Sequence, residues 1–481
     1  MPDLPTPTIS AADGAADAAA AVHRLRPEDR VGRWLGSPLG SLVARPWFDR
    51  AALWSLRRWY FPLSRLWAAA RAAHGSPAAF YDQLGLPPVA GSERRLTEAL
   101  RGFEGARASV NALEAEWRRV FFGGDPVSPD YLVAVETARL DRRMAYNAQR
   151  RHFRFLLRKA PIPLVRRNIP RPADVEAVYG PVLDDVDQAF APPDPMPEVT
   201  RSRRVPAATG TNYWLRFASP SRQTADTVYA RVYEPDGVTD PPTLIFGHGV
   251  CVEFDHWHGL IDEVDAMCAM GIRVIRPEAP WHGRRVPDGL YSGERFIGAA
   301  PMAQLDTFTA ALREWSVLVD WARQTSAGPV AMGGSSLGAL MSQLAGDRAR
   351  AWPARLRPDA LLLITHCWKH EDAVVHGQLA KVWGMGSAIR AAGWTDDLIH
   401  RYLPMIDPGD TPVVPPERIV SVLGSRDNVT PYASGLAMID AWGVPDENRF
   451  IWRRGHFSVP LTMIRDHSPL RRFHAILKEI A

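Results

Sequence analysis

The feature that most constrains this sequence is a serine bracketed by glycines, directly after a short apolar run. Val330, Ala331 and Met332 predict a buried strand, and Gly-Ser-Ser-Leu-Gly follows at 334–338. In a Gly-x-Ser-x-Gly pattern the serine can occupy a strained turn between a strand and a helix, because the glycines carry no side chains that would collide with the turn. The apolar stretch 339–345 predicts the helix that follows. We therefore interpret Ser336 as a candidate nucleophile.

A serine hydroxyl is a poor nucleophile at neutral pH, so it needs a histidine to take its proton and an acid to orient that histidine. When the serine lies in such a turn, the partners follow in the order acid, then histidine. Asp427 comes directly after the predicted strand 419–423, and His456 comes directly after the predicted strand 450–452. The sequence therefore predicts a catalytic triad of Ser336, Asp427 and His456. Glu371 and Asp372 are weaker candidates for the acid, because they follow an earlier strand.

An attacked carbonyl also needs hydrogen-bond donors for the oxygen that becomes negative. We expect the backbone N–H of Leu337 to be one donor and that of Val250, in the loop after the predicted strand 244–246, to be the other; Cys251 is the alternative. His248 is expected to brace this loop. The residues expected to line the substrate site are Gly249, Trp281, Trp368 and Trp383.

A rival interpretation is a metal site. Asp255, His256, His258 and His282 are ordinary zinc-ligand types. Their spacing matches no known metal motif, and Trp257 between two of the histidines indicates packing instead. We predict no metal and no cofactor.

The second half of the chain predicts an α/β fold. Residues 211–217 and 227–233 alternate between apolar and polar side chains, as in antiparallel strands. Short apolar runs then alternate with helical segments such as 302–325, which is typical of a doubly wound, mostly parallel sheet. We assign residues 206–481 to this catalytic domain. The insert 367–410 is expected to form a lid over an apolar pocket, with an ordinary helical excursion as the alternative.

At 481 residues the chain exceeds one ordinary domain. We predict a disordered tail over 1–28, a Trp/Arg-rich helical region over 29–160 and a Pro-rich, extended linker over 161–205. Within the helical region, apolar spacing predicts a helix over 93–122. A second helix is expected from Ser128 to about residue 159, antiparallel to the first.

Charge is distributed unevenly. Residues 1–204 hold 30 basic and 23 acidic side chains, whereas 205–481 hold 27 and 30. Tryptophans and arginines interleave over 33–71, which fits either a helix at a membrane surface or aromatic packing onto the neighbouring domain; packing is favoured. Residues 33–171 are thus the candidate region for peripheral membrane contact. We expect no nucleic-acid binding, because no recognition motif accompanies the basic residues.

We predict a cytoplasmic location. The three cysteines are scattered, the sequence has no run of about 20 apolar residues, and its start does not resemble a signal peptide. Peripheral membrane contact is compatible with this location. The sequence leaves the oligomeric state open.

Four motifs in order resemble the α/β-hydrolase superfamily, and they end at the predicted catalytic histidine: His248-Gly249, Gly334-x-Ser336-x-Gly338, Asp427-x-x-Thr-Pro431 and Gly455-His456. More narrowly, three features are similar to the abhydrolase domain-containing protein eighteen group: Glu278-Ala-Pro-Trp-His-Gly-Arg-Arg285, the Asp255-His256 pair and the Trp/Arg-rich segment. The resemblance implies an acyl ester, including lipid-like esters, as substrate. We therefore expect a serine hydrolase that acts through an acyl-enzyme. The alternatives are an acyltransferase with the same triad and a non-catalytic, membrane-associated scaffold.

Overall fold

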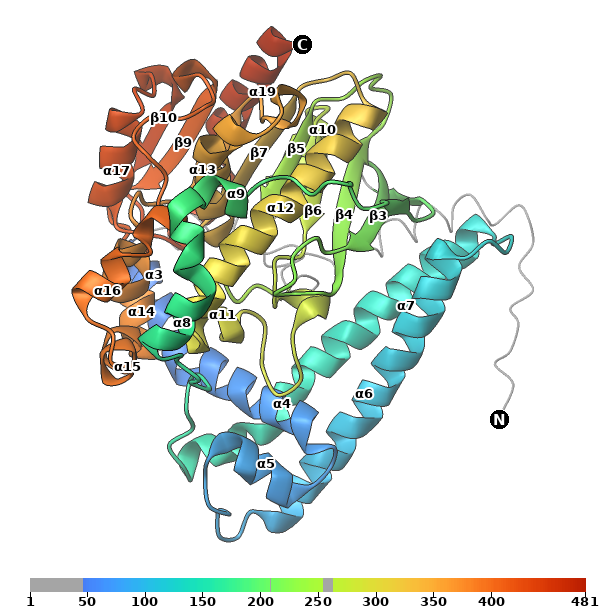
Figure 1. The fold of residues 1–481 in the computed structure, drawn as a ribbon. Coiled ribbons are helices and arrows are strands. Elements are labelled where there is room, and N and C mark those ends of the chain that lie inside the picture. The colour runs from blue at the N-terminus through green and yellow to red at the C-terminus, as the bar shows by residue number, and fades with distance from the viewer. Residues whose placement is uncertain (1–45, 208, 254–262) are drawn as a thin grey trace.

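The computed structural model describes residues 46–207, 209–253 and 263–481. A central sheet with helices on both faces forms the larger part, and a long pair of helices projects from it (Figure 1). The predicted tail 1–28 and the candidate metal ligands Asp255, His256 and His258 lie outside the described residues.

The sheet has ten strands in the order β1-β3-β4-β6-β5-β7-β8-β9-β10, and β2 pairs with β3. Pairing is antiparallel from β1 to β6 and parallel from β6 to β10. The α/β class with a mostly parallel sheet is thereby confirmed. The strands are β1 Thr200–Arg201, β2 Val205–Ala207, β3 Gly210–Ala218, β4 Thr227–Pro235, β5 Thr243–Gly247, β6 Arg273–Pro277, β7 Val330–Ser335, β8 Leu361–Ile364, β9 Ile419–Gly424 and β10 Arg449–Trp452.

Helices cover both faces of the sheet. Successive strand residues point to opposite faces, so Leu362 of β8 packs in one core cluster while Leu361 and Leu363 pack in the other. The first face is covered by α10 Glu263–Ala269 and α19 Ser468–Ile480, and the second by α12 Met302–Thr325 and α13 Leu337–Arg348. Burial on both faces explains why the central parallel strands are almost wholly apolar.

The projecting helices are α6 Glu93–Phe122 and α7 Pro129–Ala148, which lie side by side in Figure 1. The first has the predicted bounds. The second begins where expected, because the Ser128 hydroxyl accepts a hydrogen bond from the Tyr131 N–H at 3.3 Å. It ends earlier than predicted and continues as the 3-10 helix η3 Gln149–Arg158. Trp117 of α6 packs edge-on against Trp214 of β3, so the pair shares a core with the sheet.

Residues 33–45 of the Trp/Arg-rich stretch lie outside the described residues. From residue 46 the chain forms α3 Pro46–Ser55, the π-helical η2 Leu56–Tyr60 and α4 Phe61–Ala73, followed by α5 Pro77–Leu84. Trp67 is buried in the main core, as the packing interpretation expects, whereas Trp47 and Trp54 are exposed. Arg65 is fully buried and forms an ion pair of 2.9 Å with Glu294.

The predicted extended linker is wrong for much of its length. It contains α8 Pro172–Tyr179, η4 Pro181–Asp185 and α9 Val186–Ala189, and Tyr179 is buried in the main core. Proline does not prevent α8 because Pro172 occupies the first turn, where a helix needs no N–H donor.

The insert 367–410 is helical. Its elements are η8 Asp372–His376, α14 Gln378–Trp383, α15 Met385–Ala391, α16 Asp396–His400 and η9 Leu403–Met405. The remaining helices are η5 Gly283–Arg285, α11 Glu294–Gly298, η6 Ala349–Ala351, η7 Ala354–Leu356, η10 Pro416–Arg418, α17 Tyr432–Ala441, η11 Asp446–Asn448 and α18 Ser458–Met463. In the part of the chain that the structure describes, none of the helices has both the length and the apolar character needed to cross a bilayer.

Candidate active site

Ser336 lies in the turn between β7 and α13, with a backbone φ of 56° and ψ of −118°. Positive φ is unfavourable for a residue with a side chain, so the surrounding turn must hold this conformation. A Cβ added to Gly334 would lie 2.4 Å from the Gly338 carbonyl carbon, and one added to Gly338 would lie 2.1 Å from the Gly247 oxygen. Both glycines are therefore required for the turn to pack against β5.

The structure brings Ser336, His456 and Asp427 together. His456 Nε2 lies 3.1 Å from Ser336 Oγ, and His456 Nδ1 lies 2.8 Å from Asp427 Oδ2. The aspartate follows β9 and the histidine follows β10, and both are buried. Parallel strands end at the same edge of the sheet, which explains how residues 336, 427 and 456 meet.

The Asp427 carboxylate is held by its own turn. Its Oδ1 accepts hydrogen bonds from the N–H groups of Val429 at 2.8 Å and Thr430 at 3.0 Å. Thr430 Oγ1 lies 2.9 Å from Asp427 Oδ2 and 3.1 Å from His456 Nδ1. These contacts fix the carboxylate facing the imidazole. The alternative acid Glu371 instead contacts His400 at 3.0 Å.

The loop after β5 lies beside the nucleophile. A Cβ on Gly249 would lie 3.6 Å from the Ser336 Cβ, and Val250 and Leu337 line the same pocket as Ser336. Leu337 is the first residue of α13, where an N–H has no acceptor within the helix. The Cys251 N–H donates to His282 Nε2 at 3.2 Å. Of the two alternatives for the second oxyanion donor, the structure thus favours Val250.

His248 and His282 brace this loop with neutral rings. His248 Nδ1 lies 2.8 Å from the Gly249 oxygen, and its Nε2 accepts the Ala279 N–H at 3.2 Å. Burial lowers the pKa of His248 to about 4 and that of His282 to about 3. Both His282 nitrogens contact backbone groups. Among the described residues, no cluster of His, Cys, Asp and Glu is arranged to hold a metal ion.

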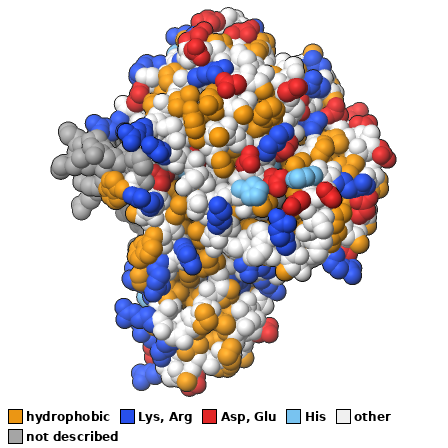
Figure 2. All heavy atoms as spheres, turned by 90° about the vertical axis from the view of Figure 1, so that its left-hand side faces the viewer, with side chains coloured by type: hydrophobic (Ala, Val, Ile, Leu, Met, Phe, Trp, Pro, Cys, Tyr) orange, Lys and Arg blue, Asp and Glu red, His pale blue; other side chains and the backbone are white. Residues whose placement is uncertain are grey.

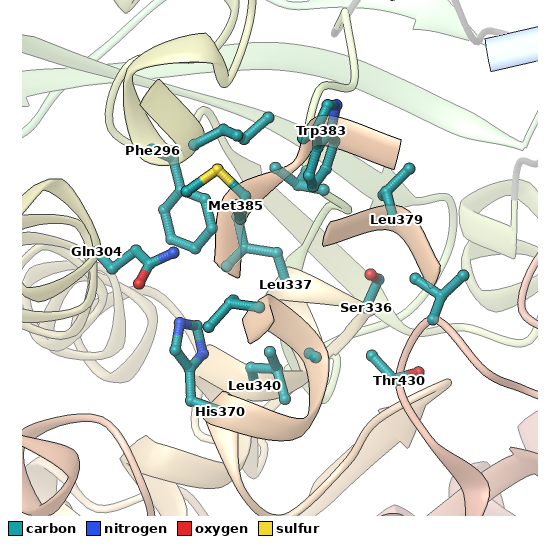
Figure 3. A pocket seen from close by; sticks show the side chains of 15 residues that line it. Phe296, Gln304, Ser336, Leu337, Leu340, His370, Leu379, Trp383, Met385 and Thr430 are labelled. Carbon is teal, nitrogen blue, oxygen red and sulfur yellow. The ribbon is translucent and has the colours of Figure 1, made fainter. Parts of the chain in front are cut away.

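A small, largely apolar cavity of about 50 Å³ opens beside Ser336 (Figure 3). Trp383, Leu379 and Met385 bring the insert to its wall, together with Phe296 of α11. Trp383, which was predicted to bind substrate, therefore lines this cavity. Two other predicted lining residues do not line this cavity, because their rings are engaged elsewhere: Trp281 lies under the Arg295 guanidinium at 4.7 Å, and Trp368 Nε1 donates to the Pro408 oxygen at 3.0 Å.

The N-terminal helices contact both loops of the site, which the sequence did not reveal. Asp49 of α3 accepts hydrogen bonds from the Phe457 N–H at 2.7 Å and from Ser458 Oγ at 2.6 Å. Tyr60 of η2 donates to the Cys251 oxygen at 2.8 Å. Nearby, Arg150 of η3 forms an ion pair of 2.7 Å with Glu253. Residues far apart in the sequence thus support the loops that carry His456 and Val250.

No family model matches the sequence, and no curated protein matches it. Solved structures resemble the fold at low identity. An acetyl xylan esterase from Paenibacillus sp. R4 is 13% identical over 65% of this chain and 96% of its own, with a TM-score of 0.44. Acetyl xylan esterase 1 from Thermoanaerobacterium sp. JW/SL YS485 is 15% identical over 62% of this chain and 96% of its own, with a TM-score of 0.37. An S-formylglutathione hydrolase from Agrobacterium tumefaciens is 12% identical over 57% of this chain and 98% of its own, with a TM-score of 0.39.

At these identities the likeness concerns the fold alone. The narrower resemblance to the abhydrolase domain-containing protein eighteen group gains no support from these comparisons and stays a prediction.

Proposed function

We propose that this protein is a serine hydrolase of carboxylic esters. The observation that carries the proposal is the hydrogen-bonded chain from Ser336 Oγ through His456 to Asp427. Ser336 directly precedes the first residue of α13 and lines a largely apolar cavity. A serine, a histidine and a buried carboxylate in this order are the groups that acyl transfer to serine requires.

In the proposed reaction, Ser336 Oγ attacks the ester carbonyl while His456 Nε2 accepts the hydroxyl proton. The carbonyl oxygen becomes negative and is bound by the N–H groups of Leu337 and Val250. Asp427 stabilises the imidazolium that forms. His456 then gives the proton to the departing alcohol, and water attacks the acyl-enzyme by the reverse sequence to release the acid.

The size of the cavity bears on the acyl group. The cavity of about 50 Å³ is small, and most of the side chains that line it are apolar. Short acyl groups are therefore favoured over long lipid chains. A panel of esters with increasing acyl length tests this point, and a maximum rate at long chains would contradict it.

Labelling with a fluorophosphonate probe tests the nucleophile. We expect the wild-type protein to be labelled and Ser336→Ala to lose the label. Ser335→Ala is the matched control, because Ser335 is the neighbouring serine in the same turn and contacts Thr365 at 3.3 Å instead of His456. Labelling of Ser336→Ala at another serine would overturn the assignment. Added short alcohols distinguish hydrolysis from acyl transfer, because a transferase would form a new ester.

Peripheral membrane contact is a second proposal, and it rests on α3. Trp47 is 48% exposed and Trp54 is 62% exposed, and Arg50 is exposed between them. Figure 2, which views the molecule from the left-hand side of Figure 1, shows basic side chains spread between hydrophobic ones. Such a mixture suits the surface of an anionic bilayer. Sedimentation with anionic vesicles tests it: the double variant Trp47→Ser, Trp54→Ser should bind less than the wild type.

A further inference from the structure

His370 is a buried polar side chain on the wall of the cavity beside Ser336. It is 2% exposed, and neither of its ring nitrogens has a hydrogen-bond partner among the described residues. Burial lowers the pKa of His370 to about 3, so the ring is neutral near pH 7 and offers one donor and one acceptor. Leaving both unsatisfied is unfavourable, and a polar group of a ligand would remove this penalty.

His370 lines the same cavity as Ser336. Its backbone is fixed, because the His370 N–H donates to Asp407 Oδ1 at 2.7 Å. Its ring packs edge-on against Phe308, with centroids 5.1 Å apart, and against Phe296, with centroids 6.1 Å apart. These apolar rings offer no hydrogen bonds to the imidazole nitrogens.

A second polar side chain faces this cavity. Gln304 of α12 lines it, and Figure 3 shows the Gln304 amide and the His370 ring across the cavity from Ser336. Trp383 also lines the cavity with its indole ring. The walls between these groups are apolar, including Leu337 and Leu340. Hydrogen-bonding capacity is therefore concentrated at a few points of an otherwise apolar cavity, as in sites that select a ligand.

The position of His456 indicates which part of an ester enters the cavity. His456 Nε2 must give a proton to the departing alcohol oxygen, so the alcohol lies on the His456 side of Ser336. The lining of the cavity includes Val250 and Leu337, the two proposed oxyanion donors, but not His456. The cavity therefore receives the acyl group.

Resting on the proposed esterase function, we propose that His370, together with Gln304, forms a polar subsite for the acyl group. Its ligand is a hydroxyl or keto oxygen carried on a short acyl chain. The substrates are thus esters of short hydroxy or keto acids, whose oxygen satisfies the imidazole while the ester carbonyl reaches Ser336.

The test compares kcat/KM for ethyl 3-hydroxybutyrate and ethyl 3-oxobutyrate with that for ethyl butyrate, which has the same carbon chain without the added oxygen. We expect the wild-type protein to prefer at least one oxygenated ester by about tenfold or more, the effect of one hydrogen bond that is otherwise left unsatisfied. His370→Leu should bring the ratio close to one, and Gln304→Met should lower it. His400→Leu is the control, because His400 lies exposed in the same insert. A wild-type ratio near one, or a preference unchanged in a folded His370→Leu protein, would overturn the subsite.

Binding measured by calorimetry separates this proposal from the esterase function. Ser336→Ala is titrated with the same three esters, so that recognition is observed without turnover. Preferential binding of an oxygenated ester, lost in the double variant with His370→Leu, supports the subsite even if the wild type cleaves no ester. Hydrolysis of ethyl butyrate with no preference in rate or binding rejects the subsite and leaves the esterase function standing. If His370→Leu does not fold, Gln304→Met decides, and an unchanged preference in that variant rejects the subsite.

Discussion

The Ser458 hydroxyl donates a hydrogen bond of 2.6 Å to Asp49 Oδ2, although the two residues are 409 positions apart in the sequence. The second carboxylate oxygen of Asp49 accepts the Phe457 N–H. Gly455, on the other side of His456, approaches so closely that an added Cβ would lie 2.4 Å from the Asp49 carboxyl carbon. One buried carboxylate therefore fixes the loop on both sides of the proposed catalytic histidine.

Asp49→Ala should lower ester turnover by about tenfold or more, because small displacements of a reacting group reduce rates strongly. The effect should fall on kcat rather than KM, since Asp49 does not line the cavity. Steady-state kinetics on a short ester measure both. Asp82→Ala, at an exposed aspartate of α5, is the control. An unchanged kcat in a folded Asp49→Ala protein would show that the loop keeps its position without this contact.

Tyr60→Phe should weaken oxyanion binding, because it removes only the hydroxyl that donates to the Cys251 oxygen. Loss of one hydrogen bond to a buried carbonyl costs roughly 1–3 kcal/mol if the carbonyl stays unsatisfied. We expect a several-fold lower kcat together with a lower melting temperature. Tyr60→Phe keeps the aromatic ring, whereas Tyr60→Ala removes the ring as well as the hydroxyl. A larger loss of kcat in Tyr60→Phe than in Tyr60→Ala would therefore contradict this explanation.

Gly338→Ala should prevent folding of the turn, because its Cβ would lie 2.1 Å from the Gly247 oxygen. Gly105→Ala is the same substitution at a position where we expect it to stabilise the protein. Gly105 lies exposed within α6. Apart from its chain neighbours and the backbone of its own helix, no atom of the described residues lies within 4 Å of an added Cβ. Alanine there should stabilise the protein by about 0.5–1 kcal/mol. Soluble yield and thermal unfolding of the two variants give the comparison; a stable, active Gly338→Ala protein would refute the turn geometry.

Buried histidines should make the protein sensitive to acid. Burial lowers the pKa of His366 from the ordinary 6.5 to about 3. Below pH 6.5 the unfolded chain therefore binds a proton that the folded protein does not, and stability falls with pH by up to about 1.4 kcal/mol per unit for such a group. His366→Gln should remove this contribution while keeping a partner for Ser421. Urea unfolding between about pH 6 and pH 4 measures the slope, with the exposed His376→Gln as control; equal slopes in wild type and His366→Gln would contradict the prediction.

Much of the fold follows from local sequence patterns. Apolar runs ended by small residues predict the parallel strands, and spacing by three and four predicts α6 with its bounds. The linker 161–205 was mispredicted because prolines in the first turn of a helix resemble prolines in an extended chain. What distinguishes them here is burial of Val175 and Tyr179 in the core, which depends on distant segments.

The three residues at 336, 427 and 456 could be anticipated because each follows its own strand, and strand order brings their ends together. Thr430 was visible only as part of a motif, and its contact with His456 required the structure. Asp49 and His370 gave no local signal. An aspartate in a helix and a histidine in an insert have many ordinary roles, and only three-dimensional packing shows what they face.

The hydrogen bond between Asp49 and Ser458 also determines when the proposed active site can form during synthesis of the chain. Asp49 is translated first and Ser458 more than 400 residues later, so the loop around His456 cannot take its final position until nearly the whole described chain has been made. Contacts of such long sequence separation form late and slowly. Chains that end before Ser458 should therefore be inactive, and the appearance of the proposed esterase activity would report that the loop around His456 has reached its final position.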